Sequence, residues 1–222
     1  MKTRFLIPSC LLLALSSLPA REFTDTQGRK LEAEIVSVSG DAVALLRAGE
    51  KRPLSAKIAI FSDADQKFIR EWAAVNIKYN FEVRHEKKKV GETKIDEGGL
   101  VGTMDKWAYV VTLKNMSGVT TPGLTVKYWV FGREMAEKGR MTARVASSGS
   151  SKLEELAHNK AATVETSSVE APRVRAKPGY YFKSGESNKN GQAAGFALRI
   201  YNEKGTEVFS HATDESYLAA AR

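Results

Sequence analysis

Few residues of this sequence have types and spacings suited to catalysis or metal binding. His85, His158 and His211 lie far apart along the chain, each in a polar context. Metal sites and catalytic triads need His, Cys or carboxylate groups that converge, and no His-x-x-x-His, Gly-x-Ser-x-Gly, Ser-x-x-Lys or glycine-rich phosphate motif occurs. The acidic pairs Asp96-Glu97 and Asp63-Ala64-Asp65 fall in a predicted turn and a predicted helix cap, which argues against calcium. We therefore expect no enzyme activity, metal or cofactor.

Two basic clusters are the strongest remaining signal. Lys87, Lys88 and Lys89 are expected in a hairpin loop, and a second cluster lies in a proline-bounded stretch beside three aromatic residues. Its basic residues alternate, so in an extended chain they would project from one side. Basic and aromatic side chains together can bind nucleic acid or glycan, whereas a charged, solvated edge strand is the structural alternative. The second cluster consists of Arg173, Arg175 and Lys177, followed by Tyr180, Tyr181 and Phe182.

The net charge is carried by one part of the chain. The sequence has a formal charge of +8. Residues 21–73 hold nine basic and nine acidic side chains, whereas residues 74–222 hold 23 basic and 17 acidic ones. A basic surface favours anionic partners such as polysaccharide, lipid headgroups or nucleic acid.

The first twenty residues have the layout of a secretory signal. Lys2 and Arg4 precede a mostly apolar run, and small residues ending at Ala20 precede a polar start at Arg21. This three-part pattern predicts export, with cleavage between Ala20 and Arg21. The apolar run is too short for a transmembrane helix, and no later run approaches that length, so we expect a secreted or periplasmic protein with no stable membrane insertion. Cys10, the only cysteine, would be removed, which excludes disulfides and thiol chemistry.

Residues 21–74 are predicted to form a small β module that ends in a helix. The alternation over 30–38, with Leu31, Ala33 and Ile35 on one face, predicts a strand, and further strands are expected at 42–47 and 52–56. Ser62 can cap a following helix. In that helix Phe68, Ile69 and Trp72 share one face, which we expect to pack onto the strands.

This module resembles the first Sla homology domain. The resemblance rests on three stretches, Phe23-Thr24-Asp25-x-x-Gly28-Arg29-x-Leu31-Glu32-Ala33-Glu34, Val43-Ala44-Leu45 with Pro53-Leu54, and Phe61-Ser62-Asp63-Ala64-Asp65-Gln66-Lys67-Phe68-Ile69. It implies an SH3-like barrel with a C-terminal helix that recognises a peptide or polymer. The family's associations are adaptor function, cytoskeletal-protein binding and ubiquitin binding, and its eukaryotic partners would not meet an exported bacterial-type protein.

Residues 75–222 are predicted to form an immunoglobulin-like β-sandwich. About seven strands with polar turns are expected, at 76–84, 106–114, 124–131, 161–171, 195–201 and 207–211 among others. One residue pattern is similar to the strand and turn of such modules, namely Trp107-x-Tyr109-x-Val111-x-Leu113-x-Asn115-x-Ser117. Residues 143–151, small and polar, are expected to form a loop, and 214–221 a short helix. Asn115-Met116-Ser117 also fits a glycosylation sequon.

These observations favour a mostly β, non-enzymatic binding or scaffolding protein of the cell envelope, with a protein or peptide partner. Two alternatives stay open. One is a polyanion or nucleic-acid binder that uses the basic second domain, and the other is an accessory protein of an extracellular enzyme system.

Overall fold

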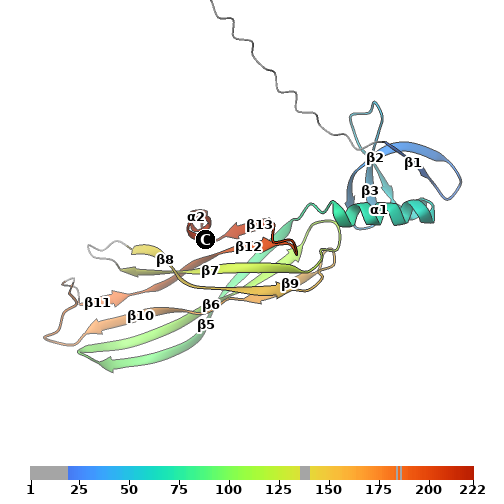
Figure 1. Ribbon diagram of the computed structural model, residues 1–222. Helices are drawn as coiled ribbons and strands as arrows, with labels where there is room; N and C mark the ends of the chain where they lie inside the picture. Colours follow the sequence, from blue (N-terminus) through green and yellow to red (C-terminus); the bar gives the residue numbers. More distant parts are fainter. Residues whose placement is uncertain (1–19, 136–140, 184, 186) are drawn as a thin grey trace, which may run out of the picture. The chain divides into compact units, whose positions relative to one another are not determined.

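The computed structural model describes residues 20–135, 141–183, 185 and 187–222 (Figure 1). The predicted signal sequence up to Pro19 lies outside these residues. The chain divides into two compact units, with the boundary between Arg70 and Glu71. Among the described residues, no helix is long and apolar enough to span a membrane. The structure is mostly β, as the sequence predicts.

The first unit is a four-stranded antiparallel sheet followed by a helix. Its strands lie in the order β1-β2-β3-β4, and the predicted strands at 30–38 and 42–47 are confirmed. A 3₁₀ turn, η1, leads from the sheet into helix α1. The bounds are β1 Arg21–Thr24, β2 Lys30–Ser39, β3 Ala42–Arg47, β4 Leu54–Lys57, η1 Ile58–Ile60 and α1 Asp63–Val75.

The core of this unit follows from the alternation in its strands. Ala33 of β2 and Val43 and Leu45 of β3 are fully buried, because alternate side chains of a strand face the same side. From α1, Ile69 enters this core and Phe68 packs against it. Phe68 and Ile69 of the predicted apolar face therefore cover the sheet.

A buried carboxylate joins the start of α1 to β1. Asp65 accepts hydrogen bonds from the backbone N–H of Thr24 at 2.8 Å and the hydroxyl of Ser62 at 2.9 Å. The guanidinium of Arg21 pairs with it at 3.0 Å and lies 3.9 Å from the centre of the Phe68 ring. Burial alone raises the pKa of Asp65, but these hydrogen bonds and the nearby cation outweigh it and hold the pKa below its ordinary value.

The second unit consists of two antiparallel sheets. One contains five strands in the order β11-β10-β6-β5, with β9 also paired to β6, and the other has the order β13-β12-β7-β8. The first sheet comprises β5 Phe81–Glu97, β6 Leu100–Asn115, β9 Ala161–Glu165, β10 Val169–Ala176 and β11 Asn188–Asn190. The second comprises β7 Leu124–Met135, β8 Met141–Leu153, β12 Gln192–Tyr201 and β13 Glu207–Ala212, and helix α2 Ser216–Ala220 follows it.

The two sheets share one apolar layer. Side chains of β6 such as Tyr109 and Leu113 meet Val126 of β7 and Phe196 of β12 in a single core, and Figure 1 shows the two sheets stacked. The outer face of β7 is covered as well, since Phe131 stacks on Tyr217 of α2 with ring centres 4.1 Å apart. Trp129 of β7 packs against the same small cluster, so both faces of this strand are partly covered.

Three sequence predictions for this unit are wrong in position. The strand expected at 76–84 begins only at Phe81, and the one expected at 161–171 is divided into β9 and β10. Residues 143–151, expected as a loop, form most of β8. Pairing with β7 overrides the weak strand propensity of Ser and Gly, and a Cβ at Gly149 would lie 2.4 Å from the Tyr128 hydroxyl oxygen. A small residue is therefore required there, and the glycine does not indicate a turn.

We predict that Asp65→Ala destabilises the first unit by about 1–3 kcal/mol, because the N–H of Thr24 and the guanidinium of Arg21 lose a buried acceptor. Hydrogen exchange of the β1 and β2 amides, measured by mass spectrometry on the whole chain, should accelerate. Asp63→Ala, an exposed acid in the same helical turn, is the matched control. Equal exchange in the two variants would contradict the role given to Asp65.

Candidate functional site

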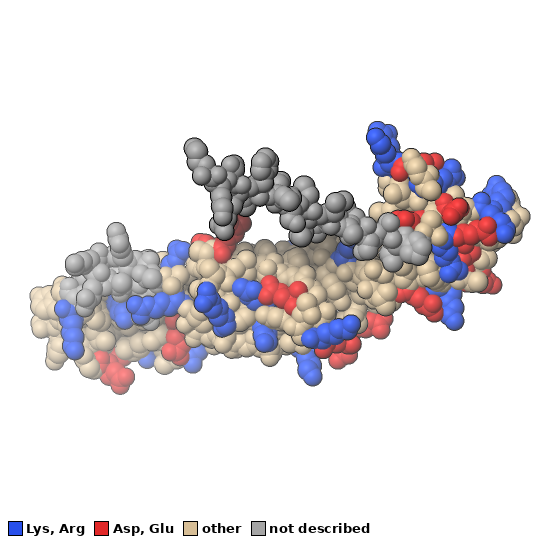
Figure 2. Space-filling view, turned by 45° about the horizontal axis from the view of Figure 1, so that its top comes forward, with Lys and Arg blue, Asp and Glu red and all other residues tan. Residues whose placement is uncertain are grey.

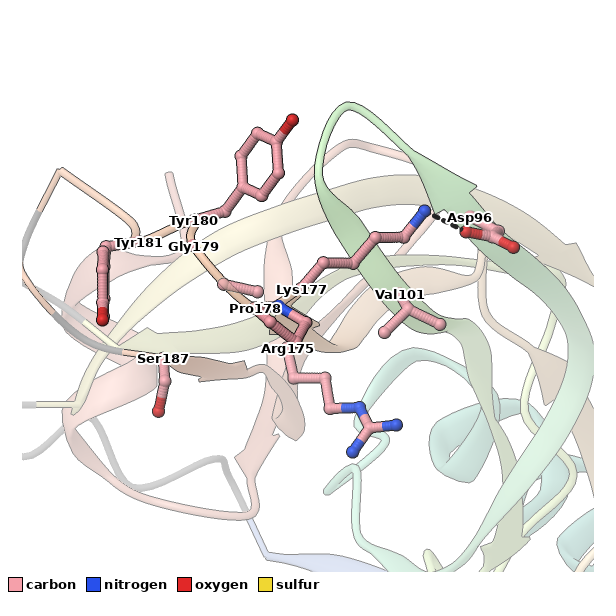
Figure 3. A pocket seen from close by; sticks show the side chains of 10 residues that line it. Asp96, Val101, Arg175, Lys177, Pro178, Gly179, Tyr180, Tyr181 and Ser187 are labelled. Atoms are coloured by element: carbon pink, nitrogen blue, oxygen red, sulfur yellow. Dashed lines mark ion pairs between the residues drawn. The ribbon is translucent and has the colours of Figure 1, made fainter.

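A groove of about 600 Å³ lies at the end of the five-stranded sheet (Figure 3). Arg175 and Ala176 at the end of β10 line it, together with the loop 177–181 and Ser187. Asp96 and Val101 contribute from the hairpin between β5 and β6. The groove thus contains two of the six predicted basic ligand residues, Arg175 and Lys177, and both predicted tyrosines.

The backbone of the β5–β6 turn holds the tyrosine loop in place. The N–H of Lys177 donates to the carbonyl of Gly99 at 2.8 Å, and the N–H of Tyr180 donates to the carbonyl of Lys177 at 3.0 Å. The Tyr180 ring lies against Gly99, where a Cβ would come within 2.4 Å of it. Gly99 also has φ +77°, so two separate constraints favour glycine at this position.

The two tyrosines present their rings to solvent. Tyr180 is 58% exposed and Tyr181 75% exposed, and Figure 3 shows the two side chains pointing in different directions from adjacent positions. A large exposed aromatic side chain is costly to leave in water, and Tyr and Arg are enriched among the residues that dominate binding energy in protein interfaces. The loop therefore has the composition of a recognition surface.

Most of the predicted basic residues are engaged within the fold. The Asp105 carboxylate, 2% exposed, pairs with Lys89 at 2.8 Å and with Arg173 at 2.7 Å. Lys89 also pairs with Glu92. The hydrogen bond from Lys89, and the charge of Arg173, hold the pKa of Asp105 below its usual value. The structure thus brings Lys89 and Arg173 together, but on an acid of the protein itself.

The three lysines of the first cluster were expected in a hairpin loop, but they lie in a strand. Lys87, Lys88 and Lys89 lie in the middle of β5, opposite Tyr109, Ala108 and Trp107 of β6. That expectation was wrong because an edge strand tolerates consecutive charges. The Lys87 ammonium donates to the carbonyl of Ala193 at 2.9 Å and lies 4.6 Å from the Trp107 ring centre, and its burial lowers its pKa. Lys88 lies 4.0 Å from Glu165.

This leaves Arg175 as the basic residue best placed for an external ligand. Lys177 pairs with Asp96 at 2.5 Å, whereas Arg175 makes no ion pair within the part of the chain that the structure describes. Figure 3 shows its guanidinium pointing away from that pair. On the face shown in Figure 2, basic and acidic side chains are interspersed and form no continuous basic stripe.

Two of the three histidines lie against the same phenylalanine. His85 and His211 both contact Phe196, with ring centres 5.1 and 6.1 Å away, although the sequence placed them in polar contexts. Burial, and then the neighbouring His85, lowers the pKa of His211. Among the described residues, no three His, Cys, Asp or Glu side chains gather as metal ligands would.

The predicted sequon contains a structural asparagine. The Asn115 side-chain nitrogen donates to the carbonyls of Val119 and Leu156, each at 2.8 Å, and its oxygen accepts from the N–H of Ser117. Asn115 is fully buried. A glycan cannot be attached to it without disrupting these bonds.

Comparison with known proteins identifies no family for this chain. No family model and no curated protein matches the chain. Seven chains of solved structures match. One is a crystal structure from Akkermansia muciniphila, with 10% sequence identity and a TM-score of 0.26 over 63% of this chain and 76% of that one. A similarity this low supports no argument about function.

We predict that Asp105→Asn lowers the free energy of unfolding by about 1–3 kcal/mol at neutral pH, since two cations lose their charged partner. A carboxyl with a lowered pKa stabilises the fold above its unfolded pKa, and that contribution is lost as the pH falls through its folded pKa. The difference between wild type and variant should therefore shrink in acid. Denaturant unfolding at a series of pH values measures it.

The control for this experiment is Glu165→Gln, which removes the longer, exposed pair with Lys88. Such a surface pair contributes about 0–1 kcal/mol. A pH-independent loss in Asp105→Asn would show that the carboxylate charge is not what stabilises the cluster.

Proposed function

We propose that this is a secreted, non-enzymatic binding protein of the cell envelope that recognises a protein or peptide partner. The observation that carries the proposal is the groove whose lining includes the exposed Tyr180 and Tyr181 and an Arg175 that makes no ion pair with the described residues. Tyrosine offers a rigid, amphipathic contact surface, and the planar guanidinium can bind a carboxylate through two parallel hydrogen bonds. An acidic side chain or chain end of a protein partner fits this combination.

The proposed architecture is a small SH3-like barrel, as the sequence predicts, followed by an immunoglobulin-like sandwich, although the four strands of the first unit form an open sheet among the described residues. In support of the first, short antiparallel strands are followed by a helix, and the bridge between Asp25 and Phe61 brings the end of the strand region back beside β1. In support of the second, β5, β6 and β9–β10 share one sheet while β7, β12 and β13 share the other. Consecutive parts of the chain thus alternate between sheets, as in immunoglobulin-like folds.

A polyanion is the weaker candidate ligand. Binding to nucleic acid or a polysaccharide chain depends on many unpaired cations along a track. Of the six predicted residues, Lys89 and Arg173 pair with Asp105, and Lys177 pairs with Asp96. Arg175 with the two tyrosines still favours a short anionic sugar or nucleotide segment as the second candidate.

We predict that Arg175→Ala combined with Tyr181→Ala reduces partner binding at least tenfold, which corresponds to about 1.4 kcal/mol. Quantitative mass spectrometry of captures from envelope extract, with wild type and variant compared side by side, should show the same proteins depleted. Arg84→Ala, which removes an exposed arginine of β5, is the control and should capture them normally.

The same captures test the polyanion alternative. Capture that disappears after nuclease or glycosidase treatment, or that falls steeply with salt, would assign the groove to a polyanion. Equal capture by wild type and the double variant would show that the groove is not the binding site.

Export generates a separate prediction. Protein recovered from the periplasm or the medium should begin at Arg21, the first residue of β1, because cleavage is expected after Ala20. Intact-mass measurement with N-terminal peptide sequencing checks this. Protein that still begins at Met1 in those fractions would contradict the signal-peptide assignment.

A further inference from the structure

The edge strands of the second unit differ in how they are protected against pairing with another chain. β5 carries charge on ten of its seventeen residues and has a register shift between Lys89 and Gly91, and both features discourage strand addition. β13 is six residues long and lies in contact with α2. Neither edge is a suitable template for a partner strand.

β8 is less protected, although it also has one register shift against β7, between Val145 and Ser147. It forms the end of its sheet, with β7 as its strand partner in the described part of the chain. Of its thirteen residues, Arg144 and Lys152 carry charge, and the seven between them contain neither charge nor proline. From Ser147 to Leu153 the register with β7 is unbroken. From Ser147 to Ser151 the edge is therefore both regular and uncharged, as a partner strand requires.

The side chains of this edge leave room for an incoming strand. Val145, Ser148 and Ser150 are exposed, and Ser147, Gly149 and Ser151 on the other face of the strand are half-buried. Cross-strand neighbours of an added strand would meet hydroxyls and a glycine, with Val145, 43% exposed, as an apolar contact. The segment can therefore accept many side chains, and its backbone would supply most of the contacts with an added strand.

The charges at the two ends of the edge indicate the kind of partner. Arg144 and Lys152 are exposed, and neither makes an ion pair among the described residues. A second copy of β8 would bring positive charge against positive charge, which disfavours self-pairing. Acidic residues on both sides of an extended segment would instead meet a cation at each end.

We propose that the edge of β8 from Arg144 to Lys152 binds an extended peptide segment flanked by acidic residues, which adds to the sheet as a further strand. The main chain supplies the hydrogen bonds, and the two cations select the partner's flanking charge. The inference rests on the proposed class of partner, a protein or peptide, but it uses a surface that does not include the groove residues Arg175, Tyr180 and Tyr181.

The test uses three labelled synthetic peptides and the whole mature chain. The first alternates valine and threonine between two pairs of glutamates, the second replaces the glutamates by lysines, and the third places proline in the middle of the first. Fluorescence anisotropy should show binding of the first peptide, at least tenfold weaker binding of the second, and none of the third. Hydrogen exchange should show protection of the β8 amides in the complex.

A charge reversal identifies the site. Arg144→Glu with Lys152→Glu should reverse the preference, so that the lysine-flanked peptide binds more tightly than the glutamate-flanked one. Lys160→Glu with Lys204→Glu changes the net charge equally at exposed lysines outside β8 and should keep the original preference.

Several outcomes would overturn the proposal. The first is equal binding of the proline peptide, and the second is an unchanged preference in the Arg144 and Lys152 variant. The third is a concentration-dependent dimer in sedimentation that this variant abolishes, because the strand bound to β8 would then belong to a second copy of the chain. Loss of peptide binding in Arg175→Ala with Tyr181→Ala but not in the β8 variant would also refute it, while supporting the groove. Failure of the groove variant alone leaves the β8 proposal standing.

Discussion

The apolar layer between the two sheets is the interaction on which the second unit depends. Cys10 is the only cysteine of the sequence, so no pair of cysteines can tie the sheets together. Their separation and register follow from packing around Phe196, which is fully buried. Strand β6 is central, because it pairs with β5, β9 and β10 and supplies Tyr109 and other residues to the core. Burial, and then the neighbouring Tyr217, raises the pKa of Tyr109 to about 12.

The buried residues of the inward row of β6 begin and end with a polar residue, and each of the two has its own set of partners. Asp105 and Asn115 are in phase with Tyr109 along the strand, and both are buried. A buried charge or amide destabilises a fold unless it is paired. Asp105 therefore holds Lys89 of β5 and Arg173 of β10 beside it, and Asn115 fixes the turn that follows β6. Along β6 the buried residues of this row therefore extend from Asp105 to Asn115.

Much of this fold could be predicted from periodicity, since β2, β3 and the core of β6 and β7 follow a period of two in their apolar residues. The errors occurred where local composition and tertiary pairing disagree. The Ser-Ser-Gly-Ser-Ser stretch has turn residues but pairs with β7, and Lys87 to Lys89 read as a loop but form an edge strand. The partners of the basic residues could not be predicted, because Asp105 is far from Arg173 in sequence. The sequence contained one indication of this pairing. Asp105 alternates with Trp107 and Tyr109, so it falls on the same face of the strand as these two residues.

The position of a cation in the fold decides whether it can bind an external ligand. Lys89 and Arg173 compensate a buried acid, so releasing them to a ligand would leave Asp105 unpaired at a cost of about 1–3 kcal/mol. Arg144, Lys152 and Arg175 make no ion pair with the described residues. Each belongs to a surface that could bind a partner. Arg175 lines the groove that also contains the two exposed tyrosines, and Arg144 and Lys152 flank the uncharged part of the edge strand β8. Net charge alone therefore gives a poor estimate of what this protein can bind, because the cations available to a partner are those that the fold does not itself require.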